Sequence, residues 1–199
     1  YKKITNLSAT TYTLGDYTDY PFDVSMFVKD DHVYVVRFDA IQKNLAYIHI
    51  QNNQIDTEII DNRLGFGLFP SVTFDSRNRI HIAYSDLTSF RLYHALQTTD
   101  GWVSTNINSV NNSGWYPDIN VNDIGQVHIV SYHSGNSKVL HTTNNNGAWK
   151  SVEILSVKPS PRNLHLFSNS AQLIFFTNDD NDNTLVQAIY SQQAWKKNE

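Results

Sequence analysis

The sequence predicts an all-β protein, a β-propeller of four four-stranded blades. Three observations lead to this fold class. The 199 residues contain four similar units about 47 residues apart, each unit holds four short runs of alternating apolar and polar residues, and no stretch of 11 residues or more shows a capped helical period. A single four-stranded sheet cannot bury both of its faces, whereas sheets stacked around an axis can.

The first strand of each unit follows a dipeptide that contains proline. These dipeptides are Tyr20-Pro21, Phe69-Pro70, Tyr116-Pro117 and Ser160-Pro161, and the alternating runs after them are 24–26, 72–74, 119–121 and 164–166. Polar turns follow at 74–79 and 122–126 in the two middle units. Because Asn, Asp and Gly favour turns, each of these segments is expected to lead into a second strand.

The remaining strands recur at regular distances. The second runs are 33–36, 80–83, 127–130 and 173–176. Eleven residues after Tyr34, His81, His128 and Ile174 stand Leu45, Leu92, Val139 and Leu185, which mark the third strands. Ten residues further stand Ile55, Trp102, Trp149 and Trp195, which are 47, 47 and 46 residues apart and mark the fourth strands.

The units divide one predicted domain, 1–199, into four blades. The expected blades are 19–66, 67–114, 115–158 and 159–199, and a strand at 2–8 is expected to complete the last blade. Residues 5–7 (Thr-Asn-Leu) match residues 105–107 (Thr-Asn-Ile) of a fourth strand, which supports this closure. The alternative is that the chain is a segment of a larger propeller of five to eight blades.

Composition excludes several classes of function. Aromatic residues make up 13% of the chain, which argues against disorder, and the net charge of -4 gives no reason to expect a nucleic-acid partner. The absence of cysteine excludes disulfides and zinc–thiolate sites. No apolar run approaches the ~20 residues of a membrane helix. We expect a secreted or cell-surface protein, because the absence of cysteine fits an exported bacterial protein. A sequence that begins at Tyr1 is expected to be either a mature form or a segment cut from a longer chain.

The second and third units carry a family resemblance. Residues 69–84 and 116–130 resemble propeller repeats of exported bacterial proteins that read Pro-Ser-x-x-x-Asp-x-x-Gly-x-x-His-x-x-Tyr, related to sialidase-like (BNR-type) repeats. The resemblance implies a propeller, but such blades occur in lectins, adhesins, lyases and hydrolases. The arginines of this chain do not recur at one repeat position, so sialidase chemistry is not assigned.

When a residue type recurs at the same position of several units, the simplest explanation is a role in packing the blades. We expect Trp102, Trp149 and Trp195 to pack against the blade edge rather than to bind a ligand. His81 and His128 share a position with Tyr34 and Ile174. A histidine that is interchangeable with isoleucine is more readily a buried, hydrogen-bonded group than a metal ligand.

A binding site is expected on the axial face, where the loops from strand two to three and from strand four to one meet. The candidate ligand-binding residues there are Trp115, Tyr116, His133, Tyr132, Tyr84, Asp86, Arg37 and Asp39. Trp115 is the one tryptophan outside the repeated position, which suits stacking on a sugar ring, with packing at the blade rim as the alternative. Asp39, Asp86 and Asp179 recur, so a role in the turns explains them equally well.

We expect no cofactor, with one alternative. The run 178–183 alternates Asn and Asp, whose oxygens are ligands of the kind that calcium takes. It departs from the calcium-loop pattern, because Thr184 stands where glycine is required. An ordinary polar turn is therefore the preferred interpretation.

These observations favour a non-catalytic binding module for a glycan or a protein. No catalytic constellation appears, although a polysaccharide-degrading hydrolase or lyase that uses His133 or an aspartate of the axial face remains an alternative. A further alternative is a structural scaffold within a larger assembly.

Overall fold

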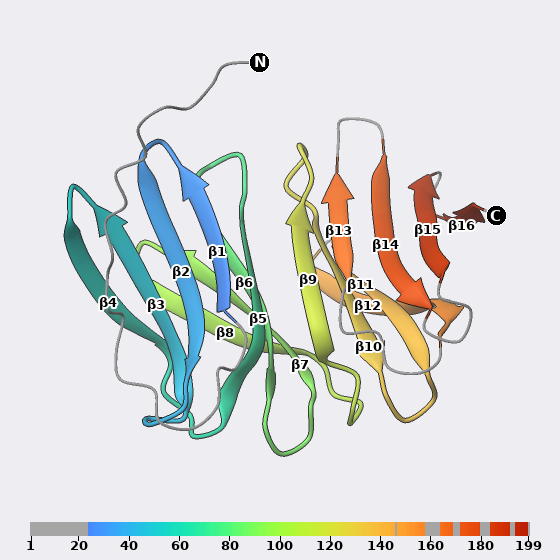
Figure 1. Cartoon of the computed structure of the whole chain (residues 1–199), viewed down its shortest axis with the longest axis horizontal. Helices are drawn as coiled ribbons and strands as arrows, with labels where there is room; N and C mark the ends of the chain where they lie inside the picture. The colour runs from blue at the N-terminus through green and yellow to red at the C-terminus, as the bar shows by residue number, and fades with distance from the viewer. Residues whose placement is uncertain are drawn as a thin grey trace.

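The computed structural model describes residues 24–145, 147–157, 164–168, 172–179, 184–191 and 194–198, and all regular structure within these ranges is β-strand (Figure 1). None of this part of the chain forms a helix that could cross a lipid bilayer.

Within the described residues, sixteen strands form four four-stranded sheets. The first sheet contains β1 (Val24–Lys29), β2 (His32–Asp39), β3 (Asn44–Gln51) and β4 (Gln54–Asp61). The second contains β5 (Phe66–Phe74), β6 (Ile80–Asp86), β7 (Leu92–Thr98) and β8 (Gly101–Asn108). The third contains β9 (Trp115–Val121), β10 (Val127–His133), β11 (Lys138–Asn145) and β12 (Ala148–Ser156). The fourth contains β13 (His165–Ser168), β14 (Leu173–Asp179), β15 (Thr184–Ser191) and β16 (Ala194–Asn198).

Each sheet is an antiparallel meander in which strands pair in chain order, so the predicted four blades are confirmed. The last blade has its own fourth strand, β16, paired with β15. The expected closing strand at 2–8 lies outside the described residues.

Strand register defines which positions of the four blades correspond. Ser25, Ser71, Asp118 and His165 correspond, because they pair with Val36, Ala83, Val130 and Phe176 of the adjacent second strands. Pro70 and Pro117 therefore correspond to Val24 and Leu164. The sequence alignment on Pro21 and Pro161 was wrong by three residues in the first and fourth units, because ladder pairing rather than the proline sets the register.

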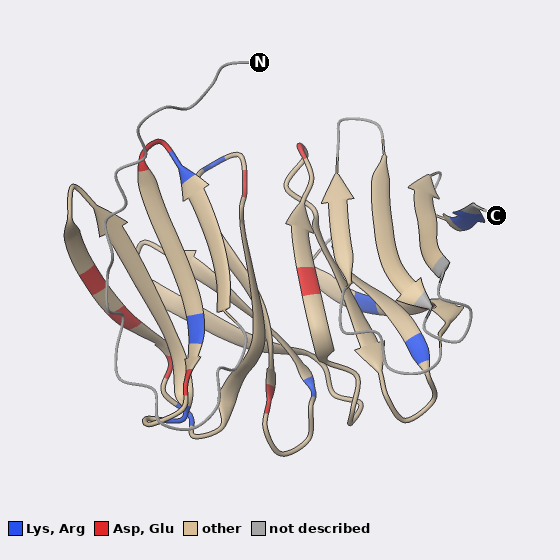
Figure 2. Ribbon diagram, in the orientation of Figure 1, with Lys and Arg blue, Asp and Glu red and all other residues tan. Residues whose placement is uncertain are grey.

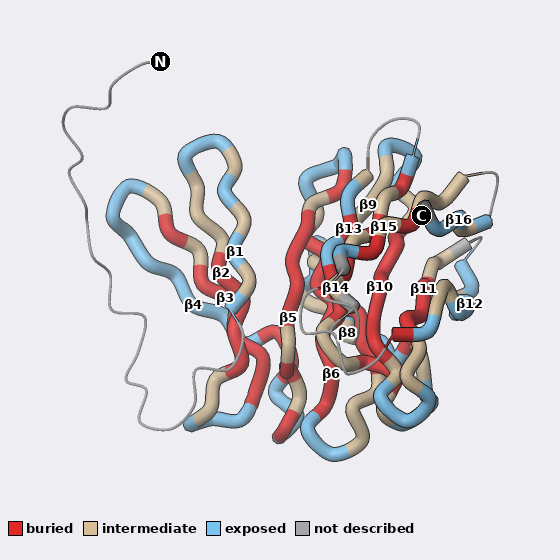
Figure 3. Tube along the Cα trace, turned by 45° about the vertical axis from the view of Figure 1, so that its right-hand side comes forward, coloured by how far each residue is buried: buried red, intermediate tan, exposed pale blue. Residues whose placement is uncertain are grey.

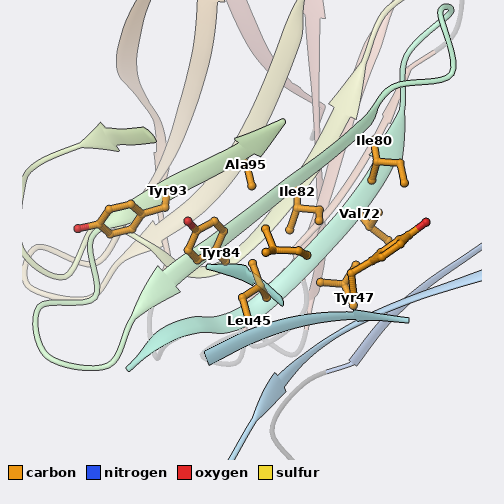
Figure 4. Close-up of a cluster of buried hydrophobic side chains, with 10 residues drawn as sticks. Leu45, Tyr47, Val72, Ile80, Ile82, Tyr84, Tyr93 and Ala95 are labelled. Atoms are coloured by element: carbon orange, nitrogen blue, oxygen red, sulfur yellow. The ribbon is translucent and has the colours of Figure 1, made fainter. Parts of the chain in front are cut away.

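The hydrophobic core is divided among the junctions between sheets. Leu45 and Tyr47 of the first sheet pack with Val72, Ile82 and Tyr84 of the second (Figure 4). Similar clusters join the second sheet to the third and the third to the fourth. Figure 3 shows the buried residues along the strands that face a neighbouring sheet. Burying one such side chain contributes about 2 kcal/mol, so the stacking of sheets supplies much of the stability.

The repeated tryptophans join consecutive sheets near the outer edge. The rings of Trp149 and His94 have centroids 5.1 Å apart, and those of Trp195 and His141 are 5.2 Å apart. Trp102 lies in the same way on Tyr47, with centroids 5.5 Å apart. Each tryptophan thus covers the third strand of the preceding sheet, as the packing interpretation predicted.

At the axis, the inner strands β1, β5, β9 and β13 lie in sequence order (Figure 1). A side chain of each of the first three inner strands accepts a hydrogen bond from a backbone N–H in the following sheet. Ser25 Oγ accepts from Val72 (3.1 Å), Ser71 Oγ from Ile119 (3.3 Å) and Asp118 Oδ2 from Leu166 (2.7 Å). These hydrogen bonds set the position of each sheet along the axis relative to the neighbouring sheet.

Candidate functional site

A pocket lies between the second and third sheets, and we call it the inter-blade pocket. It measures about 540 Å³ and opens where the first strands turn into the second strands. Its lining residues are Arg79, His81, His94, Leu96, Val103, Thr105, Ile124, Gly125, Gln126, Val127, Asn144 and Trp149. This end of the sheets is opposite to the axial face that the sequence indicated.

A buried hydrogen-bonded chain supports one wall of the inter-blade pocket. His81 and His94 stand on the adjacent strands β6 and β7, with His81 Nδ1 3.0 Å from His94 Nε2. His81 Nε2 lies 3.3 Å from Asp75 Oδ2, and Arg79 Nε donates to the same oxygen at 2.7 Å. Because an ionised carboxylate only accepts, His81 carries its proton on Nε2 and accepts at Nδ1 from His94.

The electrostatics keep both histidines neutral. Burial lowers the pKa of His94 to about 3 and also lowers the pKa of His81. Burial alone would raise the pKa of Asp75, but hydrogen bonds from Arg79 and His81 lower it to about 2. At neutral pH the wall therefore consists of one carboxylate paired with Arg79 and two uncharged imidazoles.

The open part of the pocket presents an aromatic ring beside polar groups. Trp149 is half-buried, and the Arg79 side chain is 41% exposed. Gln126 and Asn144 add amides at the rim, and Thr105 adds a hydroxyl. An indole next to several donors and acceptors can stack on the apolar face of a sugar ring while the polar groups bond its hydroxyls.

The same construction recurs at the next junction. His128 Nδ1 lies 2.9 Å from His141 Nε2, and Trp195 Nε1 donates to His141 Nδ1 at 3.1 Å. Burial lowers the pKa of His128 to about 4 and that of His141 to about 3. The prediction that His81 and His128 are buried and hydrogen-bonded is confirmed. Their partners His94 and His141 were missed, although these are also 47 residues apart.

A smaller pocket of about 230 Å³ lies at the axis, between the four inner strands. Tyr116 and Asp118 are among its lining residues, and so are Ser25 and His165. Asp118 accepts hydrogen bonds from Ser71 Oγ (2.6 Å) and from two backbone N–H groups, while burial raises its pKa. Of the candidate ligand-binding residues, Tyr116 is thus placed at the axis.

Trp115 packs within a group of aromatic side chains. Its ring stacks on Phe90 with centroids 4.0 Å apart and lies 5.5 Å from Phe69. Its Nε1 is buried and has no hydrogen-bond partner among the described residues. These contacts favour the packing alternative for Trp115 over an open stacking platform.

Tyr84 and Tyr132 belong to the core rather than to the axial face. Tyr84 is fully buried and donates its hydroxyl proton to Asp61 Oδ2 at 2.7 Å, and Tyr132 is 3% exposed. Alternation along β6 and β10 turns Tyr84 toward the preceding sheet and Tyr132 toward the following sheet.

The recurring aspartates hold turns. Asp86 Oδ1 accepts hydrogen bonds from the N–H groups of Thr88 (3.0 Å) and Ser89 (2.6 Å). Asp39 Oδ1 accepts from Ile41 in the corresponding turn of the first sheet (3.0 Å). This geometry matches the turn alternative, because an aspartate bonded to backbone two or three residues ahead is an Asx-turn.

The other two candidates lie near these turns. Arg37 is largely buried, and its Nη2 lies 3.3 Å from Asp39 Oδ2. His133 is half-buried and accepts a hydrogen bond from the N–H of Gly135 at 3.2 Å. Most of the alternating Asn/Asp run, 180–183, lies outside the described residues. Elsewhere in the described ranges, no group of three or more His, Asp or Glu side chains is arranged to hold a metal ion.

Comparison with known proteins extends the description of the fold. No family model and no curated protein sequence matches the chain. A structure of the Aleuria aurantia lectin in complex with Fucalpha1-6GlcNAc is similar with a TM-score of 0.64 and 11% identity, over 88% of this chain and 60% of the lectin chain. The Hadza microbial sialidase Hz136 is similar with a TM-score of 0.61 and 9% identity, over 88% and 45% of the two chains.

An exo-beta-1,3-galactanase from Phanerochaete chrysosporium is similar with a TM-score of 0.56 and 8% identity, over 88% of this chain and 49% of that one. The chain thus spans less than two thirds of the length of each of these three proteins. At such low identity the likeness concerns the fold alone. Together with the four meander sheets, it makes this chain a β-propeller.

Proposed function

We propose that the protein is a non-catalytic carbohydrate-binding propeller and that the inter-blade pocket holds the sugar. The observation that carries the proposal is the half-buried ring of Trp149, which lies beside Arg79, Gln126 and Asn144 in a pocket of about 540 Å³. A pocket of this volume falls within the ~300–1,000 Å³ of typical small-ligand sites.

The rigid wall behind the pocket supports binding of a neutral or hydroxyl-rich ligand. Arg79 is oriented by Asp75, and His94 is fixed by His81, so the polar groups are arranged before a ligand arrives. Preorganised groups lose little conformational entropy when a ligand binds. The lectin among the similar structures was solved with a fucosylated disaccharide, which makes fucosides the first ligands to test.

The chemistry of the lining favours binding over hydrolysis. Glycoside hydrolysis requires a pair of carboxylates that flank the scissile bond. None of the described residues that line the inter-blade pocket is an aspartate or a glutamate, and Asp118 is the single carboxylate among those that line the axial pocket.

The test is a glycan array followed by calorimetric titration of the best ligand at pH 7.5. Trp149→Ala should weaken binding at least tenfold, which corresponds to ~1.4 kcal/mol. Trp102→Ala is the matched control, because it removes a tryptophan from the same repeat position but from another junction, and it should retain binding. Arg79→Gln introduces the residue type that the third sheet has at this position, and it should also weaken binding.

Binding that survives Trp149→Ala unchanged would place the ligand elsewhere, with the axial pocket as the next candidate. Release of reducing ends from a bound polysaccharide would contradict the non-catalytic part of the proposal. An array without any ligand would contradict the carbohydrate-binding proposal as a whole.

A further inference from the structure

The inner strand of the first sheet exposes apolar side chains that the other sheets bury. Val24, Met26 and Val28 of β1 are 60%, 63% and 59% exposed. The positions that correspond to Met26 are Val72, Ile119 and Leu166, and these are 7%, 4% and 3% exposed because each faces the preceding sheet. We call Val24, Met26 and Val28 the leading patch.

The fourth sheet exposes the complementary positions. Phe167 of β13 and Leu185 of β15 are 56% and 73% exposed. The positions that correspond to Leu185 are Leu45, Leu92 and Val139, all of which are 0% exposed because the following sheet covers them. We call Phe167 and Leu185 the trailing patch.

Both patches are apolar and carry little charge. In β1 the one charged residue is Lys29, at the end of the strand (Figure 2), and the sequences of β13 and β15 contain no Asp, Glu, Lys or Arg. Farther from the axis on the same face of the first sheet, Val35, Ile48 and Ile50 form a buried cluster. On the same face, Ile55 and Ile59 of the outer strand β4 are 41% and 48% exposed. The exposed apolar surface of this face therefore lies on the inner strand, next to the axial pocket, and on the outer strand.

We propose that the leading patch of one molecule docks on the trailing patch of a second copy of this chain. The three junctions within the chain already show the contacts of such an interface. At the first junction the rings of Phe27 and Phe74 have centroids 4.9 Å apart, and the corresponding positions in the two patches are Phe167 and Val28. The new junction continues the stacking of sheets that holds the chain together.

The inner-strand hydrogen bond has a counterpart at this junction. His165 occupies the position of Ser25, Ser71 and Asp118, whose side chains accept from the backbone of the following sheet. Met26 occupies the receiving position in the first sheet. An imidazole nitrogen can accept a hydrogen bond, so His165 of one copy suits the N–H of Met26 in the next.

The interface joins two different surfaces, so it is heterologous. Each added copy leaves one leading and one trailing patch at the ends, and assembly continues unless the rotation closes a ring. Association is consequently dependent on concentration, and a substitution in either patch stops it.

The first experiment is sedimentation velocity on residues 1–199 across a range of concentrations. The wild type should show species larger than its monomer mass of 22.8 kDa. Met26→Glu and Leu185→Glu should each raise the dissociation constant at least tenfold, whereas Leu64→Glu, at a position 77% exposed outside both patches, should not. All three sites are exposed, so circular dichroism should show unchanged folding.

Mixing the two patch variants tests whether the leading patch of one molecule contacts the trailing patch of another. Met26→Glu retains a trailing patch and Leu185→Glu retains a leading patch, so the mixture should form a dimer and nothing larger. A monomeric wild type, or a mixture that remains monomeric while the single variants behave as expected, would overturn the proposal.

A cross-link identifies what covers the patches. The chain has no cysteine, so Val28→Cys combined with Phe167→Cys introduces the only two thiols. Oxidation should give a ladder of covalent multimers on a denaturing gel. A cross-link within single chains would mean that the first and fourth sheets close on each other, and it would refute the second copy as the occupant.

Discussion

Acid should destabilise this fold well above the pKa of its carboxylates, because its buried histidines resist protonation. Burial holds the pKa of His94 and His141 at about 3 and that of His128 at about 4, below the ordinary value of 6.5. The unfolded chain therefore binds these protons more readily than the folded chain. Stability is complete above pH 6.5 and is lost as the pH falls from there toward the folded-state values.

The size of the loss follows from the gap between the two pKa values. Each pH unit below 6.5 removes ~1.4 kcal/mol per histidine, so at pH 5 one neutral histidine reduces the free energy of unfolding by about 2 kcal/mol. His81 and His94 form one contiguous pair and His128 and His141 another. Every imidazole of the unfolded chain takes up its own proton, so counting only one histidine of each pair gives a lower bound of about 4 kcal/mol for the loss. This is a large part of the ~5–15 kcal/mol of a typical domain.

The assay is urea unfolding at several pH values between 7.5 and 5. The informative variant is His128→Ile combined with His141→Gln, which introduces the residues that the fourth sheet has at these positions, Ile174 and Gln187. It should remove about half of the pH dependence. Leu64→Gln is the control, because Leu64 is 77% exposed and neither residue carries a proton that titrates in this range, so it should leave the slope unchanged.

The reasoning would be refuted by a wild-type free energy of unfolding that changes by less than ~1 kcal/mol between pH 7 and pH 5. The double variant would refute it independently if its slope equalled that of the wild type. Asp75 should not affect the pH dependence measured between pH 7.5 and pH 5. Hydrogen bonds outweigh the effect of its burial and lower its pKa to about 2, so its contribution to the free energy of unfolding is lost only below pH 4.

Three further predictions concern the junctions between sheets. Asp118→Ala should cost about 2–4 kcal/mol, since it leaves the Ser71 hydroxyl and the N–H of Leu166 without their acceptor, whereas Asp118→Asn should cost less; urea unfolding at pH 7.5 measures both. Leu92→Ala should cost about 2–5 kcal/mol by creating a cavity between the second and third sheets, against less than ~1 kcal/mol for the exposed Leu64→Ala. Gly114→Ala should destabilise the fold by about 1–3 kcal/mol, because its Cβ would lie 2.8 Å from the backbone of Arg91; an unchanged melting temperature would contradict this steric argument.

The repeat made the fold accessible from sequence. The strand pattern recurs in every unit, and Trp102, Trp149 and Trp195 recur at intervals of 47 and 46 residues. A repeat of this kind can be recognised from the sequence alone. Register was harder to predict. A proline indicates that a strand begins soon after it. It does not determine that Ser25 pairs with Val36 or that His165 pairs with Phe176, because this register depends on the hydrogen bonds between the strands.

The candidate site was less accessible for a related reason. The sequence directed attention to residues that differ between units, such as Trp115, whereas the inter-blade pocket is lined by residues that recur, such as His81 and Trp149. Residues that recur were interpreted as packing residues, and His81 is indeed a buried residue that packs between strands. A pocket forms where side chains from two different sheets meet, and that relation cannot be read from one unit alone.

The hydrogen bonds between inner strands have a consequence for how such a chain can evolve. The second and third segments each supply one acceptor to the following segment and donate to one in the preceding segment, so duplication or deletion of such a segment preserves matching contacts at both ends. Gain or loss of whole modules should therefore be tolerated more readily than insertion of a few residues within a strand, and natural variation in this architecture is expected as changes in module number.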